Sequence, residues 1–235
     1  MKTILTILLG VFALSATGQN LTANQLLEKA ITYHDPNGNW ETFSGLLNIE
    51  LEMPDRPARF SQVQIDLPNE FFRLTMSIEG NHTTRVVDKG VCTFTLNGSD
   101  KVSEEDIKKH RGDCERSTMF KNYYTYLYGL PMKLKDPGTH IDPVVQKKTF
   151  KGKEYLVLRA TYDQEVGSDI WQFYFNPTTY AMEVYQFFKG PEETTGEYIL
   201  LTDEMEIGGI KMPKDRAWYY NKDNGYLGTD KLVKK

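Results

Sequence analysis

Hydrophobic and polar residues alternate through most of this chain, and such alternation predicts β-strands with one buried face. The clearest segment is FFRLTMSI, in which Phe72, Leu74, Met76 and Ile78 alternate with mainly polar residues. Comparable segments follow one another at short intervals, in residues 46–53, 61–68, 83–90, 91–98, 153–162, 169–188 and 196–220. Parallel strands need long crossover connections, so this spacing predicts an antiparallel sheet of about ten or eleven strands.

Three other segments carry the signals of helices, either an apolar stripe or a capping pattern. The first begins with the capping pair Thr22 and Gln25, and its apolar stripe ends before the turn DPNG at residues 35–38. The second begins at Ser103, an expected N-cap that acidic residues follow. The third, in residues 117–131, carries an apolar and aromatic stripe made of Phe120, Tyr123, Tyr124, Leu127 and Tyr128. This stripe either packs on the sheet or forms a lid over a ligand cavity.

Too little helix lies between the strands for a parallel β-α-β sheet, so the predicted fold class is α+β, mainly antiparallel β. Asn176 begins the sequence NPTT, which predicts a hairpin between two strands. Gly208 and Gly209 predict a second turn of this kind. Residues 131–143 contain three prolines and predict an irregular loop. No stretch has the composition of a linker or the period of a repeat, so one domain is expected.

A histidine and an aspartate stand side by side where the first predicted helix ends. Pro36 disfavours helical geometry at Asp35, so His34 is expected in the last turn, where a partly protonated imidazole would meet the negative helix end. A catalytic pair requires the two side chains to face each other and a nucleophile to activate. Adjacent residues at a helix end rarely meet this requirement, so His34 is predicted to be structural and dispensable for activity.

The first residues of the chain have the pattern of a secretory signal peptide. Lys2 precedes an apolar run in residues 4–16, and the small residues of the sequence ATG lead up to Gln19. We therefore expect a signal peptide in residues 1–18 and a mature domain in residues 19–235. The apolar run is shorter than the roughly 20 residues that span a bilayer, and an uncleaved anchor is the alternative. No other apolar run approaches that length, so no transmembrane segment is expected in the mature chain.

Export changes the interpretation of the two cysteines, Cys92 and Cys114. An even number of cysteines in an oxidising compartment predicts a disulfide between them. Two free buried thiols are the alternative. The sequence contains no C-x-x-C motif, so thiol–disulfide exchange chemistry is not expected.

Composition and motifs argue against several functional classes. The chain has a net charge of −4 and no cluster of Lys and Arg, so it is not expected to bind nucleic acid. The histidines at positions 34, 82, 110 and 140 are too far apart for a local metal motif. Phosphate-binding, dinucleotide-binding and serine-nucleophile motifs are also missing, and acidic runs such as GPEETTGE at residues 190–197 are predicted to be solvated. The sequence therefore predicts no enzyme, no metal site and no cofactor.

Several motifs occur in a characteristic order along the chain. The first helix is followed by Trp40, Phe43 and Gly45 in the pattern W-x-x-F-x-G-x-L-x-I, and then by DLPNEFFRL and a D-x-G turn. The second half contains FNPTTYAMEVYQF and GGIKMPKDRAWY, which begin at residues 175 and 208. This layout resembles the superfamily of periplasmic lipoprotein carriers (LolA-type) and outer-membrane lipoprotein-sorting proteins. YHDPNGNW and YLYGLPMKLKDPG are similar to an uncharacterised periplasmic subgroup with that architecture.

The resemblance implies a strongly curved antiparallel sheet, an unclosed barrel whose concave face is covered by the N-terminal helix and the inserted helices. It also implies a cavity on that face for an acyl chain or another apolar ligand. If so, the alternating apolar residues of two strands face this cavity, and the apolar stripe of the third helix covers it. The candidate lining residues are Phe72, Leu74, Met76, Ile78, Tyr124, Leu127, Tyr128, Trp171, Phe173 and Phe175.

The sequence thus predicts a periplasmic protein that binds or carries a lipid, an acyl chain or another hydrophobic molecule without catalysis. Its expected partners are a hydrophobic small molecule, a lipid or a lipidated protein. The expected location is the periplasm, and secretion from the cell is the alternative. Two functional alternatives stay open. One is an envelope interaction or sensing domain whose core is filled by side chains, and the other is an unrecognised hydrolase or lyase.

Overall fold

The structure is a computed structural model, which describes residues 21–78 and 80–234. The expected signal peptide in residues 1–18 and the expected mature N-terminus, Gln19, lie outside these residues. Among the described helices, none is both long enough and apolar enough to cross a membrane.

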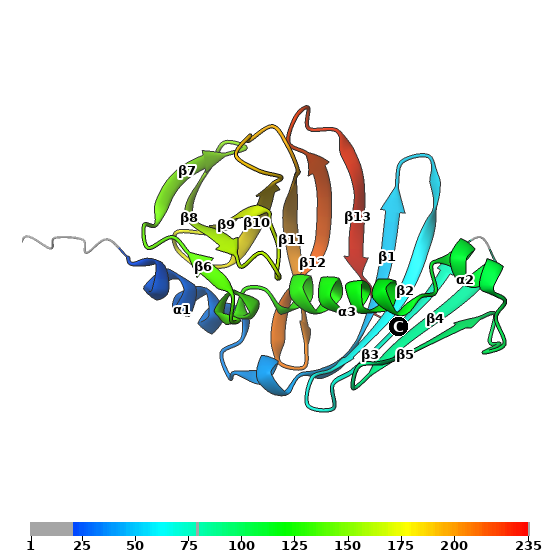
Figure 1. Ribbon diagram of the computed structural model, residues 1–235. Coiled ribbons are helices and arrows are strands. Elements are labelled where there is room, and N and C mark those ends of the chain that lie inside the picture. Colours follow the sequence, from blue (N-terminus) through cyan, green and yellow to red (C-terminus); the bar gives the residue numbers. More distant parts are fainter. Residues whose placement is uncertain (1–20, 79, 235) are drawn as a thin grey trace, which may run out of the picture.

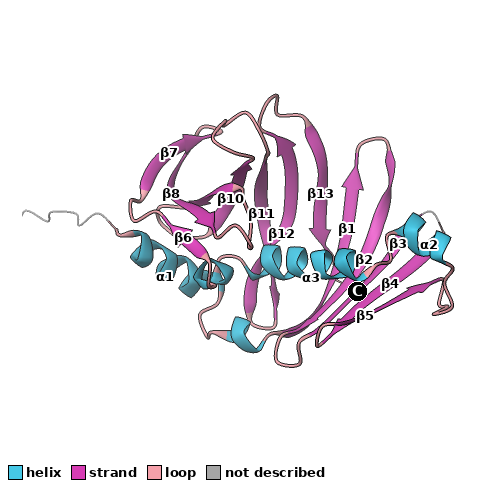
Figure 2. Ribbon diagram, viewed as in Figure 1, coloured by secondary structure: helices cyan, strands magenta, loops and turns pink. Residues whose placement is uncertain are grey.

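Thirteen strands within the described residues form one antiparallel sheet, which curves into an unclosed barrel (Figures 1 and 2). In chain order they are β1 (Ser44–Met53), β2 (Arg56–Asp66), β3 (Phe71–Ile78), β4 (Asn81–Asp88), β5 (Val91–Leu96), β6 (Thr139–Ile141), β7 (Gln146–Phe150), β8 (Lys153–Tyr162), β9 (Ile170–Phe175), β10 (Met182–Phe188), β11 (Glu197–Ile207), β12 (Ile210–Tyr220) and β13 (Tyr226–Leu232). Their order across the sheet is β5-β4-β3-β2-β1-β13-β12-β11-β10-β9-β8-β6, and β7 also pairs with β8. The predicted fold class, mainly antiparallel β with one open curved sheet, is therefore confirmed.

The sheet has more strands than predicted, because three strands lack clear alternation. β6 has three residues and lies in the segment whose prolines predicted an irregular loop. β7 is short and carries two lysines. β13 lies in the centre of the sheet, between β1 and β12, but carries Gly228 and Asp230 on the concave side. Small or charged residues at inward positions break the apolar–polar alternation by which a strand is predicted from sequence.

Three α-helices and two short 3-10 helices complete the described structure, namely α1 (Ala23–His34), η1 (Asn39–Thr42), α2 (Glu104–His110), α3 (Cys114–Gly129) and η2 (Met132–Lys135). The predicted capping box is present, since Thr22 Oγ1 accepts the Gln25 N–H at 3.2 Å and the Gln25 side chain accepts the Thr22 N–H at 3.0 Å. Ser103 caps α2 as predicted, and Asp113 caps α3 by accepting the Arg116 N–H at 2.7 Å. Local sequence therefore determines where each α-helix begins.

α3 crosses the concave face of the sheet, as Figure 1 shows, and contacts fix both of its ends. At its first residue, the predicted disulfide between Cys92 and Cys114 is confirmed, with a Cα–Cα distance of 5.4 Å, and it joins α3 to β5. At its last residue, Gly129, a Cβ would lie 2.2 Å from Cζ2 of Trp40, so glycine lets the helix end approach that ring. α3 is therefore held in place on the sheet at both of its ends.

The main hydrophobic core lies between the concave face of the sheet and the helices that cover it. Leu26 and Ala30 of α1 are buried there against strand residues. Eight of the ten predicted cavity residues belong to this core, namely Phe72, Leu74, Met76, Tyr124, Leu127, Tyr128, Phe173 and Phe175. A second, smaller cluster lies on the opposite face of the sheet and consists of Tyr155, Val157, Tyr174 and Val184.

His34 has a structural position, but its physical setting differs from the predicted one. The side chain is buried, and its imidazole joins α1 to two strands. Its Nδ1 lies 2.7 Å from the Lys211 carbonyl oxygen of β12, and its Nε2 accepts the Met182 N–H at the start of β10 at 2.9 Å. These partners require a neutral ring that donates from Nδ1, and burial lowers the pKa of His34. The expected contact between a partly protonated imidazole and the helix end is therefore wrong.

Asp35 serves a different part of the structure. Its carboxylate accepts the backbone N–H groups of Asn39 and Trp40, both at 2.8 Å, and so satisfies the first two donors of η1. The side chains of His34 and Asp35 thus bind separate backbone groups. These partners leave neither side chain positioned to activate the other.

Candidate functional site

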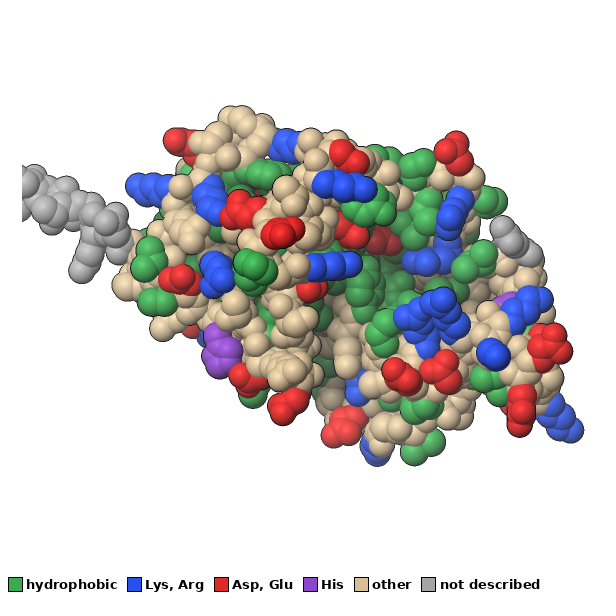
Figure 3. Space-filling view, turned by 45° about the horizontal axis from the view of Figure 1, so that its top comes forward, with side chains coloured by type: hydrophobic (Ala, Val, Ile, Leu, Met, Phe, Trp, Pro, Cys, Tyr) green, Lys and Arg blue, Asp and Glu red, His purple; other side chains and the backbone are tan. Residues whose placement is uncertain are grey.

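The helices cover only part of the concave face, and a groove of about 430 Å³ stays open beside α3. We call it the concave groove. Figure 3, which turns the top of Figure 1 forward, shows a hollow with hydrophobic side chains inside and charged side chains of both signs around it. The groove is lined by residues of β1, β2, α3 and β9 to β13, namely Leu51, Met53, Arg59, Tyr123, Tyr126, Leu127, Trp171, Phe187, Glu197, Trp218, Leu227, Gly228 and Asp230.

Aromatic rings from the sheet and from α3 form the walls of the groove. Tyr123 of α3 stacks on Trp218 of β12, with ring centroids 6.5 Å apart. Tyr126 of α3 meets Trp171 of β9 edge to face at 5.6 Å, and Trp171 stacks on Phe187 of β10 at 5.0 Å. β11 lies between these two groups of rings in the sheet, so its inward side chains emerge between aromatic walls.

Asp230 is a buried carboxylate of the groove, and Trp218 and two arginines lie near it. Its Oδ2 accepts the Trp218 Nε1–H at 3.0 Å. Burial raises the pKa of Asp230, and the nearby charges of Arg59 and Arg216 oppose this rise. Arg216 itself is fully buried, with its guanidinium 3.9 Å from the centroid of the Tyr128 ring. A hydrogen bond and the charges of two nearby arginines thus offset part of the cost of burying Asp230.

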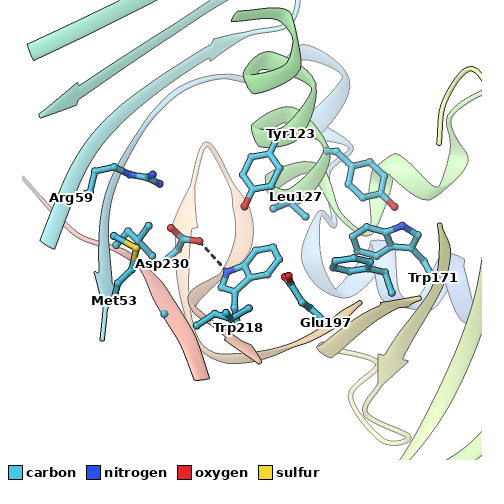
Figure 4. Close-up of a pocket in the computed structure, with 13 residues that line it drawn as sticks. Met53, Arg59, Tyr123, Leu127, Trp171, Glu197, Trp218 and Asp230 are labelled. Carbon is cyan, nitrogen blue, oxygen red and sulfur yellow. Dashed lines mark hydrogen bonds between the residues drawn. The ribbon is translucent and has the colours of Figure 1, made fainter. Parts of the chain in front are cut away.

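Glu197 is a second carboxylate of the groove, and it lacks such compensation. It is the first residue of β11, where it is half-buried and lies across from Phe187 of β10. Burial raises the pKa of Glu197, and the exposed Lys189 opposes this rise. No hydrogen bond or ion pair joins the Glu197 carboxylate to the part of the chain that the structure describes. Figure 4 shows this side chain between those of Trp218 and Trp171.

The structure brings Leu127 and Trp171, two of the ten predicted cavity residues, into the concave groove. Ile78 is exposed at the end of β3. The other seven are buried in the core and leave almost no surface for a ligand, namely Phe72, Leu74, Met76, Tyr124, Tyr128, Phe173 and Phe175. Alternation predicts that strand residues share a face, but the path of the helices decides which part of that face is covered. A role of these residues in ligand binding stays a prediction.

Most residues of the groove have no clear signal in the sequence. Arg59, Trp218 and Asp230 belong to no motif that predicts a site, and the acidic run that ends at Glu197 is expected to be solvated. For Glu197 that prediction is wrong, because the side chain points inward on the same side of β11 as the buried Ile199. The two-residue spacing from Glu197 to Ile199 was the signal that could have placed this carboxylate on the concave face.

A larger hollow of about 1200 Å³ lies along another side of α3. Polar and charged residues of α3 and of the loop before β9 line much of it. Tyr123, Tyr126 and Trp171 line both hollows, so these three rings separate them. The Tyr126 hydroxyl is hydrogen-bonded to that of Tyr162, which fixes one of the separating rings. Because most of its lining residues are apolar or aromatic, the concave groove is the more apolar of the two hollows.

The lining of the concave groove offers apolar surface, aromatic faces, two carboxylates and one guanidinium. Among the residues that the structure describes, it contains no His, Cys, Ser or Lys. Across residues 21–78 and 80–234, no group of three or more His, Cys, Asp or Glu side chains is placed to hold a metal ion. The groove can therefore enclose an apolar molecule and offer it charged contacts of either sign.

Comparisons with known proteins agree with this architecture. A model of a family of unknown function, DUF6503, matches residues 2–235, and no curated protein matches the chain. Among solved structures, a LolA superfamily protein from Nitrosomonas europaea is similar with a TM-score of 0.53 and 12% identity, over 91% of this chain and 92% of that chain. A domain of Vibrio parahaemolyticus assigned to outer membrane lipoprotein sorting has a TM-score of 0.47 and 9% identity, over 89% of each chain. The first similarity shows a LolA-like fold and confirms the predicted resemblance at that level.

Proposed function

We propose that this chain, which belongs to the family of unknown function DUF6503, binds one hydrophobic ligand, such as a lipid or an acyl chain, in the concave groove without catalysis. The observation that carries this proposal is the open groove on the concave face of a LolA-like sheet. Its volume of about 430 Å³ falls within the range of roughly 300–1,000 Å³ that small-molecule sites occupy. Removal of such apolar surface from water favours association with an apolar molecule.

The size of the groove favours a ligand with a single chain. Its volume lies near the lower end of that range because side chains fill the rest of the concave face, where Leu74 and Phe173 are fully buried. The filled part of the face supports the alternative of an interaction or sensing domain. A packed core, however, accounts for the buried residues and not for the aromatic walls that stay open, so ligand binding is the stronger proposal.

The side chains of the groove support binding more than catalysis. A hydrolase or lyase needs a nucleophile or a general base within hydrogen-bond reach of the ligand. Of the two carboxylates, Asp230 accepts a hydrogen bond from Trp218, and the described lining offers Glu197 no Ser, Thr, Cys or Lys side chain to activate as a nucleophile. His34, the histidine considered from the sequence, binds backbone groups elsewhere in the fold.

We further propose that residues 19–235 form a single mature domain that acts in the periplasm. The signal-peptide pattern of residues 1–18 supports this localisation. The disulfide between Cys92 and Cys114 also supports it, because such bonds persist in oxidising compartments. Secretion beyond the periplasm has the same support. In either place the ligand would be a lipid, a free acyl molecule or the acyl group of a lipidated protein.

A fluorescence titration with N-phenyl-1-naphthylamine, an uncharged apolar probe, tests this function. The test variant is Leu51→Trp, because Leu51 lies on the groove wall between its strand partners Arg59 and Asp230. The matched control is Leu46→Trp, which places the same ring on the same strand at a position that is 46% exposed and outside the groove. Overpacking at position 51 costs about 1–3 kcal/mol, so a melting curve accompanies each titration.

Wild type and the Leu46→Trp control should show saturable binding of the probe, and Leu51→Trp should show much weaker binding while it stays folded. Absence of binding in the wild type would refute the proposal. Equal binding in folded Leu51→Trp would place the probe outside the concave groove and would refute it as well.

A further inference from the structure

Glu197 and the rings beside it form a distinct region of the concave groove. The carboxylate emerges from β11, and Figure 4 shows it between Trp218 and Trp171. Phe187 is its direct neighbour on the adjacent strand β10, and it stacks on Trp171 with ring centroids 5.0 Å apart. Tyr123 of α3 stacks on Trp218 at 6.5 Å and continues the wall on the other side. A half-buried carboxylate is therefore flanked by aromatic rings on both sides.

This carboxylate is placed where its charge is poorly compensated. Glu197 is half-buried, and shielding part of a carboxylate from water is unfavourable, so burial raises the pKa of Glu197. Lys189 is the cation that opposes this rise, but its side chain is exposed and does not line the groove. Asp230, by contrast, receives a hydrogen bond from Trp218. Unfavourable placements of this kind are characteristic of functional sites, where a ligand supplies what the protein lacks.

The chemistry of this region matches a positively charged head group. An ammonium ion is attracted to the faces of Trp, Tyr and Phe rings, and choline-like groups are bound by aromatic cages. The Glu197 carboxylate adds a direct charge attraction at the same place. An anionic head group would be repelled by both Glu197 and Asp230, which outnumber Arg59, the single cation among the described lining residues.

We propose that the ligand of the concave groove is an amphiphile with a positively charged amine head, whose ammonium group lies against Glu197 between Trp171 and Trp218. This inference rests on the proposed function, because the apolar tail occupies the rest of the groove, towards Leu51 and Met53. The recognised chemistry is an alkylammonium group. Either the head group of a lipid or a free long-chain amine can supply it.

Four amphiphiles with the same dodecyl chain test the inference by isothermal titration below their micelle concentrations. Dodecyltrimethylammonium represents a free amine, dodecylphosphocholine a lipid head group, dodecyl maltoside a neutral head and dodecyl sulfate an anionic head. In the wild type, at least one ammonium compound should bind more tightly than the maltoside, and the sulfate should bind least. Tighter binding of the phosphocholine would indicate a lipid as the source, and tighter binding of the trimethylammonium compound would indicate a free amine.

The variant Glu197→Gln keeps the shape of the side chain and removes its charge. It should lower the ratio of ammonium to maltoside affinity by roughly tenfold, the change expected when a partly desolvated charge contact is lost. Glu206→Gln is the matched control, because Glu206 is exposed on the same strand and lies outside the groove, and it should keep the wild-type ratio.

The inference and the proposed function fail in different ways. An unchanged ratio in Glu197→Gln, or a wild type that prefers the sulfate or treats all four heads alike, overturns the inference and leaves the proposed function intact. A wild type that binds none of the four compounds contradicts the proposed function and the inference together. The head-group preference of the wild type decides the question even where a variant does not fold.

Discussion

Replacing His34 with alanine should destabilise the protein far more than the loss of a helix-end contact would. The imidazole is 1% exposed and makes two hydrogen bonds to backbone groups of other elements. Without the ring, the Lys211 carbonyl and the buried Met182 N–H both lose their partner. The perturbation therefore acts on the contacts that hold α1 against β10 and β12.

The magnitude follows from these contacts. A buried backbone group left without a partner costs about 1–3 kcal/mol, so two such groups in His34→Ala cost at least about 2 kcal/mol. The cavity left by the ring adds to this, as in other large-to-small substitutions. We therefore expect a loss of about 3–4 kcal/mol in the free energy of unfolding. For a domain of this size, that loss corresponds to roughly 6–16 °C in melting temperature.

Urea unfolding followed by circular dichroism measures this loss in His34→Ala. The matched control is His140→Ala, because the His140 side chain is 61% exposed and its ion pair with Asp163 lies at the surface. The control should change the free energy of unfolding by less than about 1 kcal/mol. If His34→Ala stayed within that same limit, with an unchanged dependence on urea, the described role of the buried imidazole would be wrong.

His34 should also make stability depend on pH. Burial lowers the pKa of His34 in the folded protein, whereas the pKa of histidine in an unfolded chain is about 6.5. Below that value the unfolded chain binds a proton that the folded protein does not, so stability falls as the pH drops, by at most about 1.4 kcal/mol per pH unit. The wild type should thus lose more stability than His34→Ala between about pH 7.5 and about pH 5.5. Equal losses would contradict a neutral buried ring.

Three further substitutions give expected changes in stability that urea titrations or melting curves can check. Replacing both Cys92 and Cys114 with serine should lower the free energy of unfolding by about 3 kcal/mol, and no change would show that the tether of α3 to β5 is unimportant. Gly129→Ala should cost about 1–3 kcal/mol, because the new Cβ would lie 2.2 Å from Trp40 Cζ2, and wild-type stability would argue against this close approach. Glu197→Gln should raise the melting temperature near neutral pH but not near pH 4, because a carboxyl whose folded pKa is raised loses stability as the pH rises through its titration range. A lower melting temperature at neutral pH would mean that the carboxylate is compensated.

Much of the fold could be predicted from the sequence because it depends on neighbouring residues. Thr22 and Ser103 mark helix starts through hydrogen bonds to residues three positions away. Asn176 closes the predicted hairpin between β9 and β10, where its N–H donates to the Ala181 carbonyl at 2.9 Å. Alternation in β3 gave the buried face of that strand correctly. A single sequence carries all of this information, since each feature spans only a few residues.

The concave groove could not be predicted in the same way, because it depends on contacts between distant parts of the chain. β13 enters the centre of the sheet and brings Asp230 into register with Leu51 of β1. The path of α3 then decides that Leu74 is covered and that Leu127 reaches the groove. Neither fact has a local signal in the sequence. The charged residues of the groove interrupt the alternation that identifies strands, so pattern analysis passes over them.

The most direct test of ligand binding in the concave groove uses the three tryptophans of the chain, which lie in two different settings. Trp171 and Trp218 line the groove, whereas Trp40 is 7% exposed and packs against Gly129 and Phe43 away from it. The indole N–H signals of all three can be followed in ¹H–¹⁵N correlation spectra of labelled protein during a titration with dodecyl maltoside. Binding in the groove predicts saturable shifts for Trp171 and Trp218 and a nearly constant signal for Trp40. Constant signals for Trp171 and Trp218 at saturating maltoside would contradict it.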